Sequence, residues 1–237
     1  MMDSFFTFEG EPSTEFSVFI EDDHTNDSAE REYETASVPG MNGDILYSNG
    51  RLKNGTLPYN CWIADDYVAN ARNLRNFLLS VEGYGRLEDT RHPEEFRKAF
   101  FRGPQNFDDV VSYTAGKFTI NFEVKPQRWL KSGEVWRTVN KGSIYNKELW
   151  PAQPIIRVYG NFSTAQQVSV GDYVFTVKKC TGYVDIDCEM QDAYNDSGSQ
   201  NTNVNIVEFP VLVPGDNQVD YDSGVTGVDI LPRWWRV

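Results

Sequence analysis

Hydrophobic and polar residues alternate along many short segments of the chain, and only one segment has a helical spacing. In the segment 117–124, Phe118, Ile120, Phe122 and Val124 occupy every second position. Because successive side chains of a strand point to opposite faces, this period predicts a strand with one buried face. Short apolar runs separated by Gly, Pro, Asn and Asp also fill the second half of the chain. That pattern predicts an antiparallel β-sandwich or jelly roll.

The strands expected in the second half are spaced closely. They lie at residues 154–160, 166–170, 173–179, 183–190, 206–213 and 227–235. The polar segment 191–205 between two of them predicts a loop. Segment 125–136 is rich in Pro, Gly and charge, and we place a domain border there, between domains at residues 1–130 and 131–237.

Residues 65–81 have the spacing of an amphipathic helix. Their apolar residues recur at steps of three or four, at Val68, Ala71, Leu74, Leu78 and Val81. This period predicts one helix whose apolar stripe faces the core. Asp65 or Asp66 is expected to cap its N-terminus, and Gly83 follows its end.

Turn signals are concentrated between residues 37 and 60, as Pro39-Gly40, Asn42-Gly43, Asn49-Gly50 and Asn54-Gly55. Asn-Gly accepts positive φ at both central positions of a type I′ hairpin turn. Asn49-Gly50 is therefore expected to join a strand at 44–48 to one at 51–54. The polar segment 21–32 predicts a loop, and segment 83–104 predicts a turn-rich connection.

Composition narrows the possible functions of this chain of 237 residues. Its 35 acidic and 22 basic residues give a formal net charge of −13. This balance argues against binding to nucleic acid or to anionic membrane surfaces, because both kinds of binding require basic patches. The N-terminus has no secretory-signal pattern, and no segment approaches the ~20 apolar residues of a transmembrane helix. Cys61, Cys180 and Cys188 are expected to be reduced thiols, with the last two poorly placed to pair.

Candidate chemistry is sparse. His24 and His92 have no nucleophile near them in sequence, and there is no Gly-x-Ser-x-Gly elbow, zinc spacing or phosphate-binding glycine loop. We therefore assign no catalytic, cofactor-binding or metal-binding residues, and expect neither an enzyme nor a cofactor.

Asp185, Asp187 and Glu189 form the one carboxylate cluster of interest. On a strand all three face the same side, ~7 Å apart from one to the next. The run loosely resembles the Glu-x-Asp-x-Glu signature of a jelly-roll family of β-glucan hydrolases, with a shorter side chain at its first position. A cation site is another interpretation. The main expectation is a solvated face of an antiparallel strand.

Several blocks in order resemble the distal tail protein of siphophages that infect Gram-positive bacteria. The pattern RxYExxSVPGxNGDxLxxNGRxxN is matched from Arg31 to Asn54. Further blocks resemble other parts of the family: YGRLEDTRHPEEFRKAFF at 84–101, KPQRWLKSGE at 125–134, PIIRVYG at 154–160 and ILPRWW at 230–235. Met41 departs from the pattern, which leads one to expect Arg in that turn.

The resemblance implies a mainly β fold, with a β-sandwich-like ring domain containing one α-helix and a C-terminal galectin-like antiparallel β-sandwich. It implies a structural hub of the phage tail tip that is located in the virion and assembled in the host cytoplasm. The ring would be a homohexamer that joins the tail tube to the tail-associated lysin or fibre and to receptor-binding or baseplate proteins. DNA would pass through its channel without stable binding, and no membrane would be bound.

With this resemblance, the turn-rich segment 37–60 is interpreted as a hairpin that docks on a neighbouring subunit. The candidate subunit-interface residues are Pro39, Gly40, Met41, Asn42, Gly43, Asp44, Asn49, Gly50 and Arg51. A hairpin that merely closes its own domain is the alternative. A carbohydrate-binding sandwich module and a jelly-roll glycoside hydrolase are the alternative functions for the chain.

Overall fold

The computed structural model describes residues 4–21, 28–103, 109–112 and 115–237. Contacts divide the chain into unit 1, residues 1–128 with 237, and unit 2, residues 129–236. Antiparallel strands dominate both units, and α1 (Tyr67–Ser80) is the one α-helix of the described residues. The expected mainly β fold with a single helix is confirmed. Among the same residues, no helix is long and apolar enough to cross a membrane.

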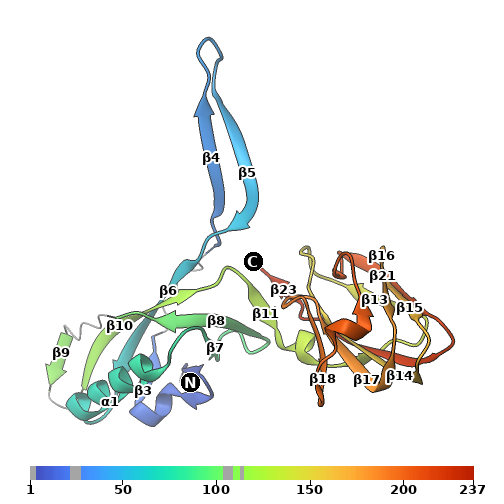
Figure 1. Ribbon diagram of the computed structural model, residues 1–237. Helices are drawn as coiled ribbons and strands as arrows, with labels where there is room; N and C mark the ends of the chain where they lie inside the picture. Colours follow the sequence, from blue (N-terminus) through green and yellow to red (C-terminus); the bar gives the residue numbers. More distant parts are fainter. Residues whose placement is uncertain (1–3, 22–27, 104–108, 113–114) are drawn as a thin grey trace. The chain divides into compact units, whose positions relative to one another are not determined.

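Unit 1 is built on one strongly curled sheet (Figure 1). Its strands follow the order β2 (Glu11–Pro12), β1 (Phe6–Phe8), β7 (Gly85–Asp89), β8 (Glu95–Phe101), β10 (Ala115–Val124), β6 (Gly55–Ile63) and β3 (Val18–Ile20), with β9 (Asp109–Ser112) paired to β10. The 3-10 helix η1 (Ser13–Phe16) precedes β3. A bridge between Ser4 and Ile20 joins the chain before β1 to β3, so the sheet curls back on itself.

Aromatic side chains fill the core of unit 1. The predicted alternation in β10 is confirmed, because Phe118, Ile120, Phe122 and Val124 are all buried. The Phe122 ring lies 5.6 Å from that of Phe6, measured between centroids. Such pairs stabilise a core beyond their buried area.

Helix α1 covers this core with a slightly different face from the one predicted. Ala71, Leu74 and Leu78 are buried as expected, but Val68 is 56% exposed and Tyr67 is buried in its place. The Tyr67 ring lies against Gly116, where a Cβ would come within 2.4 Å of it. The expected aspartate cap is also absent, because Asp66 adopts a left-handed conformation and makes no side-chain cap bond.

Segment 83–104 contains the hairpin of β7 and β8 rather than only a connection. Asp89 organises its turn, since Oδ1 accepts the backbone N–H groups of Arg91 and His92 at 2.9 and 2.8 Å. The Tyr59 hydroxyl donates to Asp89 Oδ2 at 2.7 Å. The many charged residues of this segment obscure the alternation of apolar and polar positions that would have predicted two strands. His24 lies outside the described residues.

Unit 2 is an antiparallel sandwich of two sheets, as predicted. One sheet has the order β12 (Arg137–Thr138), β22 (Val225–Leu231), β14 (Ile155–Phe162), β17 (Cys180–Asp187), β18 (Asp192–Asn195), β19 (Gly198–Ser199). The other has the order β13 (Ser143–Asn146), β21 (Gly215–Tyr221), β15 (Gln166–Val170), β16 (Tyr173–Val177), β20 (Val204–Asn205). Their inner faces share one hydrophobic core, which includes Ile156, Val184, Val168 and Phe175. The short strands β11 (Arg128–Leu130) and β23 (Trp235–Arg236) pair with each other, and η2 (Lys131–Glu134) follows β11.

Two predictions about unit 2 were wrong. Residues 191–205 are not a plain loop, since they hold β18, β19, β20 and the 3-10 helix η3 (Asn201–Asn203). Asn side chains of this segment make local hydrogen bonds. For example, Asn201 Oδ1 accepts a hydrogen bond from the N–H of Ala193 at 2.8 Å. Residues 206–213 are not a strand, and only Leu212 forms a bridge, to Ala152. Pro210 lacks the N–H that a ladder requires, and Val207 is 96% exposed.

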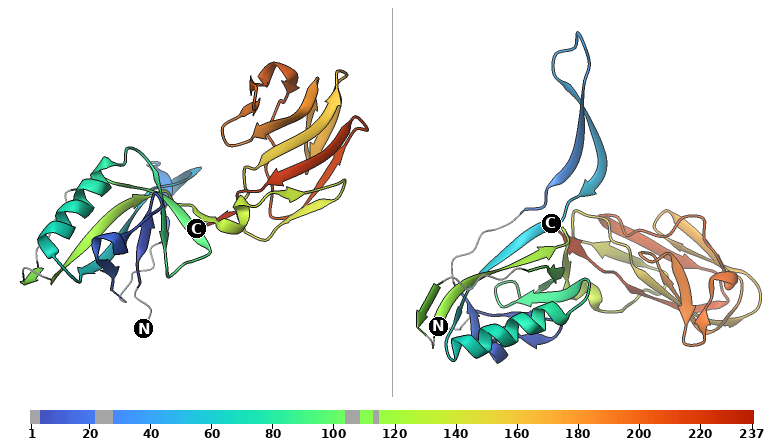
Figure 2. Two further views of the ribbon diagram at one scale, coloured as in Figure 1. Left: turned by 90° about the horizontal axis from the view of Figure 1, so that it is seen from below. Right: turned by 60° about the vertical axis from the view of Figure 1, so that its left-hand side comes forward.

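A two-stranded hairpin of β4 (Arg31–Ser37) and β5 (Asp44–Leu52) extends from the body of unit 1 and pairs with no other strand of the described chain (Figures 1 and 2). We call residues 31–52 the arm.

Candidate assembly surface and the carboxylate cluster

The tip of the arm is the turn between Ser37 and Asp44, which pair across the hairpin. Gly40 and Gly43 have φ of +83° and +82°, a region that glycine enters without strain. The Met41 N–H donates to the Val38 carbonyl at 3.1 Å. Of the nine candidate interface residues, Pro39, Gly40, Met41, Asn42, Gly43 and Asp44 therefore lie together at the tip.

Asn49-Gly50 does not form the hairpin turn that the sequence predicted. Both residues lie inside β5, where the register shifts, because Arg31 faces Leu52 and Tyr33 faces Ser48. The extra residues of β5 make a bulge, and Gly50 has φ of +74° there. Candidates Asn49, Gly50 and Arg51 thus lie toward the base of the arm, away from the other six.

Polar bonds hold the bulge in shape. Glu32 faces it and contacts Arg51 Nη1 at 3.4 Å and Asn49 Nδ2 at 3.3 Å. Asn49 Oδ1 also accepts the N–H of Arg51 at 2.9 Å. The Asn-Gly pair was a correct signal for positive φ at Gly50 but not at Asn49, and the sequence could not distinguish a bulge from a turn.

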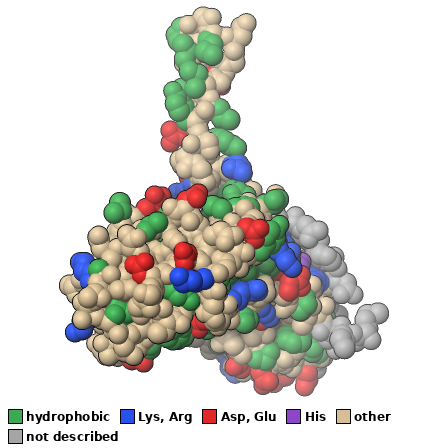
Figure 3. Space-filling view, turned by 90° about the vertical axis from the view of Figure 1, so that its right-hand side faces the viewer, with side chains coloured by type: hydrophobic (Ala, Val, Ile, Leu, Met, Phe, Trp, Pro, Cys, Tyr) green, Lys and Arg blue, Asp and Glu red, His purple; other side chains and the backbone are tan. Residues whose placement is uncertain are grey.

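The outer part of the arm exposes apolar side chains on both faces, and green side chains follow its length in Figure 3. Exposed fractions are 47% for Tyr33, 59% for Leu46 and 56% for Tyr47. From the register, Tyr33 and Leu46 share one face, while Tyr47 lies on the other with Ile45. A two-stranded hairpin is at best marginally stable alone in water, and clustered exposed apolar groups mark interaction surfaces.

In unit 2, the carboxylates of Asp185 and Asp187 are buried, not solvated, which corrects the expectation from sequence. Both project from β17 to the face opposite the core. Arg157 lies directly across from Asp185 in β14 and donates to its two oxygens at 2.6 and 2.7 Å. The guanidinium carbon of Arg157 also lies 4.7 Å from the Trp136 ring centroid and 4.3 Å from that of Tyr183.

Asp187 has a matching arrangement with a different arginine. Arg233 donates to its two oxygens at 2.8 and 2.7 Å, and Asp187 Oδ1 accepts the N–H groups of Glu189 and Met190, both at 3.0 Å. Glu189 lies beyond the strand, 3.5 Å from Arg233. The sequence analysis missed both arginines, because they are distant in sequence from the aspartates. The register of β14 against β17 places Arg157 opposite Asp185, and the fold of the C-terminal segment places Arg233 beside Asp187.

The electrostatics of this cluster suit structure rather than glycoside cleavage. Burial acts to raise the pKa of Asp187, but the hydrogen bonds from Arg233 and the backbone outweigh burial and hold that pKa below its usual value. The pKa of Arg157 is raised, chiefly by its hydrogen bonds to Asp185. A general acid for glycoside cleavage needs a raised carboxyl pKa, which is the opposite shift.

Neither metal ligands nor a thiol pair are gathered in the described part of the chain. No three His, Cys, Asp or Glu residues there are placed to hold a metal ion. Cys61, Cys180 and Cys188 are free and buried, and burial raises the pKa of the Cys188 thiol to about 12. Such thiols are poor nucleophiles at neutral pH.

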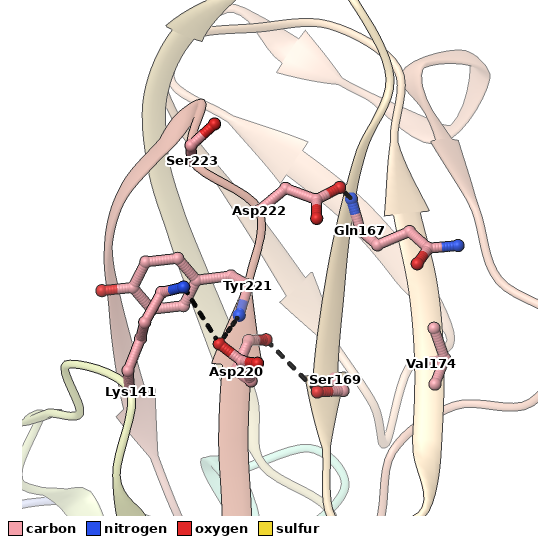
Figure 4. Close-up of a pocket in the computed structure, with 8 residues that line it drawn as sticks. All are labelled: Lys141, Gln167, Ser169, Val174, Asp220, Tyr221, Asp222 and Ser223. Carbon is pink, nitrogen blue, oxygen red and sulfur yellow. Dashed lines mark hydrogen bonds and ion pairs between the residues drawn. The ribbon is translucent and has the colours of Figure 1, made fainter.

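A shallow polar depression of about 380 Å³ lies over β15, β16 and β21 (Figure 4). Lys141 Nζ contacts Asp220 at 3.2 Å and lies 5.2 Å from the Tyr221 ring centroid. Asp222 accepts the backbone N–H of Gln167 at 2.7 Å. Because Lys141 covers one face of the Tyr221 ring, that face is not an open platform on which a sugar could stack.

Comparison with known proteins identifies relatives of the fold. No protein-family model and no curated protein sequence matches the chain. Among solved structures, the Dit (gp 19.1) protein of phage SPP1 matches with a TM-score of 0.77 and 16% identity over 96% of each chain. It is described as a paradigm of the hub adsorption apparatus in phages that infect Gram-positive bacteria.

Two structures of the phage P2 baseplate in its activated conformation also match. The structure with Ca has a TM-score of 0.57 and 8% identity over 97% of each chain. The structure with Sr has a TM-score of 0.52 and 9% identity over 99% of this chain and 98% of the other. Over nearly its whole length, the chain therefore has the fold of the SPP1 Dit hub protein.

Proposed function

We propose that the chain is a structural hub protein of the distal tail tip of a long, non-contractile phage tail. The observation that carries this proposal is the match to SPP1 Dit, which covers 96% of both chains and so includes both units. A fold alone does not determine function. Here, however, the fold agrees with the sequence blocks that resemble distal tail proteins and with an arm that pairs with no other strand of its described chain.

In this proposal, six copies of the N-terminal domain form a ring with a central channel, and the C-terminal domain is a galectin-like sandwich on the outside. A closed ring requires two different patches on each subunit, one for each neighbour. The arm is one such patch. Its tip residues Pro39–Asp44 and its bulge residues Asn49, Gly50 and Arg51 are the proposed interface residues.

The ring would join the tail tube above to the tail-associated lysin or fibre below, and would carry receptor-binding or baseplate proteins during host attachment. The protein would be located at the tail tip of the virion and would assemble in the host cytoplasm. These partners are supported by the resemblance of the sequence blocks and by the hub fold.

The protein would act without turnover, cofactor or metal. Its carboxylate cluster is neutralised by arginines rather than poised for acid catalysis. Genome DNA would cross the channel without stable binding, because a net charge of −13 favours a lining without net positive charge. Binding of duplex DNA at micromolar affinity or tighter near physiological salt, measured by filter binding, would contradict this point.

Native mass and imaging test the proposal. Light scattering or mass photometry over a concentration series is expected to detect a species of six copies. Imaging of tail tips is expected to show six-fold density for this protein. A tip in which the protein has another symmetry, or from which it is missing, would refute the hub assignment.

A further inference from the structure

Helix α1 carries a second surface that the described part of its own chain leaves exposed. Val68, Arg72, Arg75 and Leu79 are all exposed, with Val68 and Leu79 at 56% and 54%. At 3.6 residues per turn, these four positions fall within about 60° of the helix circumference and span about 16 Å. They form one stripe, apolar at both ends and basic in the middle, which we call the α1 stripe.

The arginines of the α1 stripe are unusual among the basic residues of unit 1. In the described part of unit 1, Arg72 and Arg75 are the basic side chains that make no hydrogen bond, ion pair or ring contact. The chain has 35 acidic residues available to pair with 22 basic ones. Two adjacent arginines left unpaired in so acidic a protein indicate a surface that meets acidic groups elsewhere.

The outer part of the arm has the complementary chemistry. Near its base, Arg51 pairs with Glu32 and Lys53 pairs with Glu30. Farther out, Glu34 and Asp44 are exposed, and neither has an ion pair or side-chain hydrogen bond in the described structure. The exposed Tyr33, Leu46 and Tyr47 lie beside them. From the register, Glu34 and Tyr47 share one face of the arm, while Asp44 shares the other with Tyr33 and Leu46. The face of Glu34 and Tyr47 is apolar and acidic, whereas the α1 stripe is apolar and basic.

The arm and α1 lie on opposite sides of the body of unit 1 in both views in which the arm stands clear (Figures 1 and 2). The helix that could receive the arm is therefore that of another copy. A contact between different patches of successive copies is heterologous, and it generates a ring when the rotation between copies closes.

We propose that the face of the arm that carries Glu34 and Tyr47 docks on the α1 stripe of the next copy, with Glu34 paired to Arg72 and Arg75. The apolar ends of the stripe, Val68 and Leu79, pack on Ile45 and Tyr47, which share the face of Glu34. This inference rests on the proposed ring and names the surface that receives the arm.

Disulfide cross-linking tests the contact directly. The double variant Tyr47→Cys with Leu79→Cys is expected to form covalent oligomers under mild oxidation. On a non-reducing gel these should give a ladder of bands whose largest species contains six copies. Background reaction is low because the three native cysteines are buried. The matched control is Tyr47→Cys with Val174→Cys, since Val174 is equally exposed, at 56%, but lies in unit 2. It is expected to yield no ladder.

Charge reversal tests the proposed pairing. Arg72→Glu with Arg75→Glu is expected to weaken self-association at least about 100-fold, because like charges would then face each other across the contact. Adding Glu34→Arg to the same chain is expected to restore association in part, because an arginine of the arm then faces the two introduced glutamates. The control is Lys147→Glu with Lys179→Glu, which reverses two lysines of unit 2 that are exposed and unpaired among the described residues. All these side chains are exposed, so an unchanged thermal unfolding midpoint verifies folding.

The outcomes separate this inference from the ring itself. A six-copy ring that yields no ladder in the Tyr47→Cys, Leu79→Cys variant and tolerates reversal of both arginines would overturn the docking surface and leave the ring intact. Loss of association without rescue by Glu34→Arg would overturn the pairing with Glu34. A chain that remains monomeric at every concentration, in the wild type and in the double cysteine variant, would overturn both proposals.

Discussion

The arm and the outer face of the six-stranded sheet in unit 2 are both antiparallel surfaces that lie outside a core, and they differ in what their side chains contact. On the sheet, Asp185 and Asp187 are buried and each has two bonds to one arginine of the same chain. On the arm, Tyr33, Leu46 and Tyr47 face solvent. The charges of the sheet face are paired within one chain, whereas these apolar groups of the arm remain exposed.

The difference teaches how to separate structural from assembly residues in this protein. Burying a carboxylate without a partner is costly, so a buried acid whose guanidinium partner is present has a structural explanation. Apolar side chains that remain exposed on an isolated two-stranded hairpin contribute little to the stability of their own chain. Substitutions in the two regions should therefore affect different measurements: stability for the sheet face, and association for the arm.

The largest effect is expected from shortening the arm. Replacing Thr35–Leu46 by Asn-Gly would join Glu34 directly to Tyr47, its cross-strand partner, through a two-residue turn. Association should weaken by about 1,000-fold or more, equivalent to about 4 kcal/mol. Sedimentation velocity measures this change. The thermal midpoint of the two cores should not move, and a large drop in it would show that the arm supports its own domain instead.

The next effect concerns the sheet face. Asp187→Asn leaves Arg233 without its charged partner and should reduce the free energy of unfolding by about 3 kcal/mol, measured by urea unfolding. Asp172→Asn is the control, because Asp172 is exposed and makes no ion pair in the described structure. Association per folded chain should be unchanged in both variants. A defect in assembly without a loss of stability would contradict the structural role.

Low pH should remove the contribution of the Asp187–Arg233 ion pair to the free energy of unfolding. The pKa of Asp187 is lowered in the folded protein, so its stabilising effect is present above the ordinary aspartate pKa of about 3.9 and is lost as pH falls through the folded value. The difference in unfolding free energy between wild type and Asp187→Asn should therefore be constant from pH 7 to pH 5 and shrink below about pH 4. A difference that persists undiminished at about pH 2 would exclude an ionic origin.

The smallest effect is expected at the bulge. Gly50→Ala places a Cβ on a residue with φ of +74°, at a cost of about 1 kcal/mol. Amide exchange in the arm should accelerate by about fivefold, while the thermal midpoint of the cores stays fixed. Gly142→Ala is the control, because Gly142 does not have positive φ and a Cβ there meets only the Asn140 carbonyl at 4.0 Å. Equal acceleration of exchange across unit 1 would show that the arm is not energetically separate.

Much of the fold could be predicted because its signals are local. The alternation in Phe118–Val124, the helical spacing of Ala71, Leu74 and Leu78, and the aliphatic strands of unit 2 each depend on residues close in sequence. Local patterns of this kind reflect one buried face per element. Glycines at positive φ were also foreseen at the tip of the arm, where Asn42-Gly43 lies.

The sequence by itself determined a mainly β chain with one helix, an acidic surface and a turn-rich segment that matches a known pattern. Only the tertiary structure decided that Asn49-Gly50 is a bulge, that Asp185 and Asp187 are buried against Arg157 and Arg233, and that Val68 faces solvent. The physical reason is that register, burial and ion pairing depend on which strand lies beside which. Residues such as Asp187 and Arg233, 46 positions apart, meet only when the whole sheet has formed.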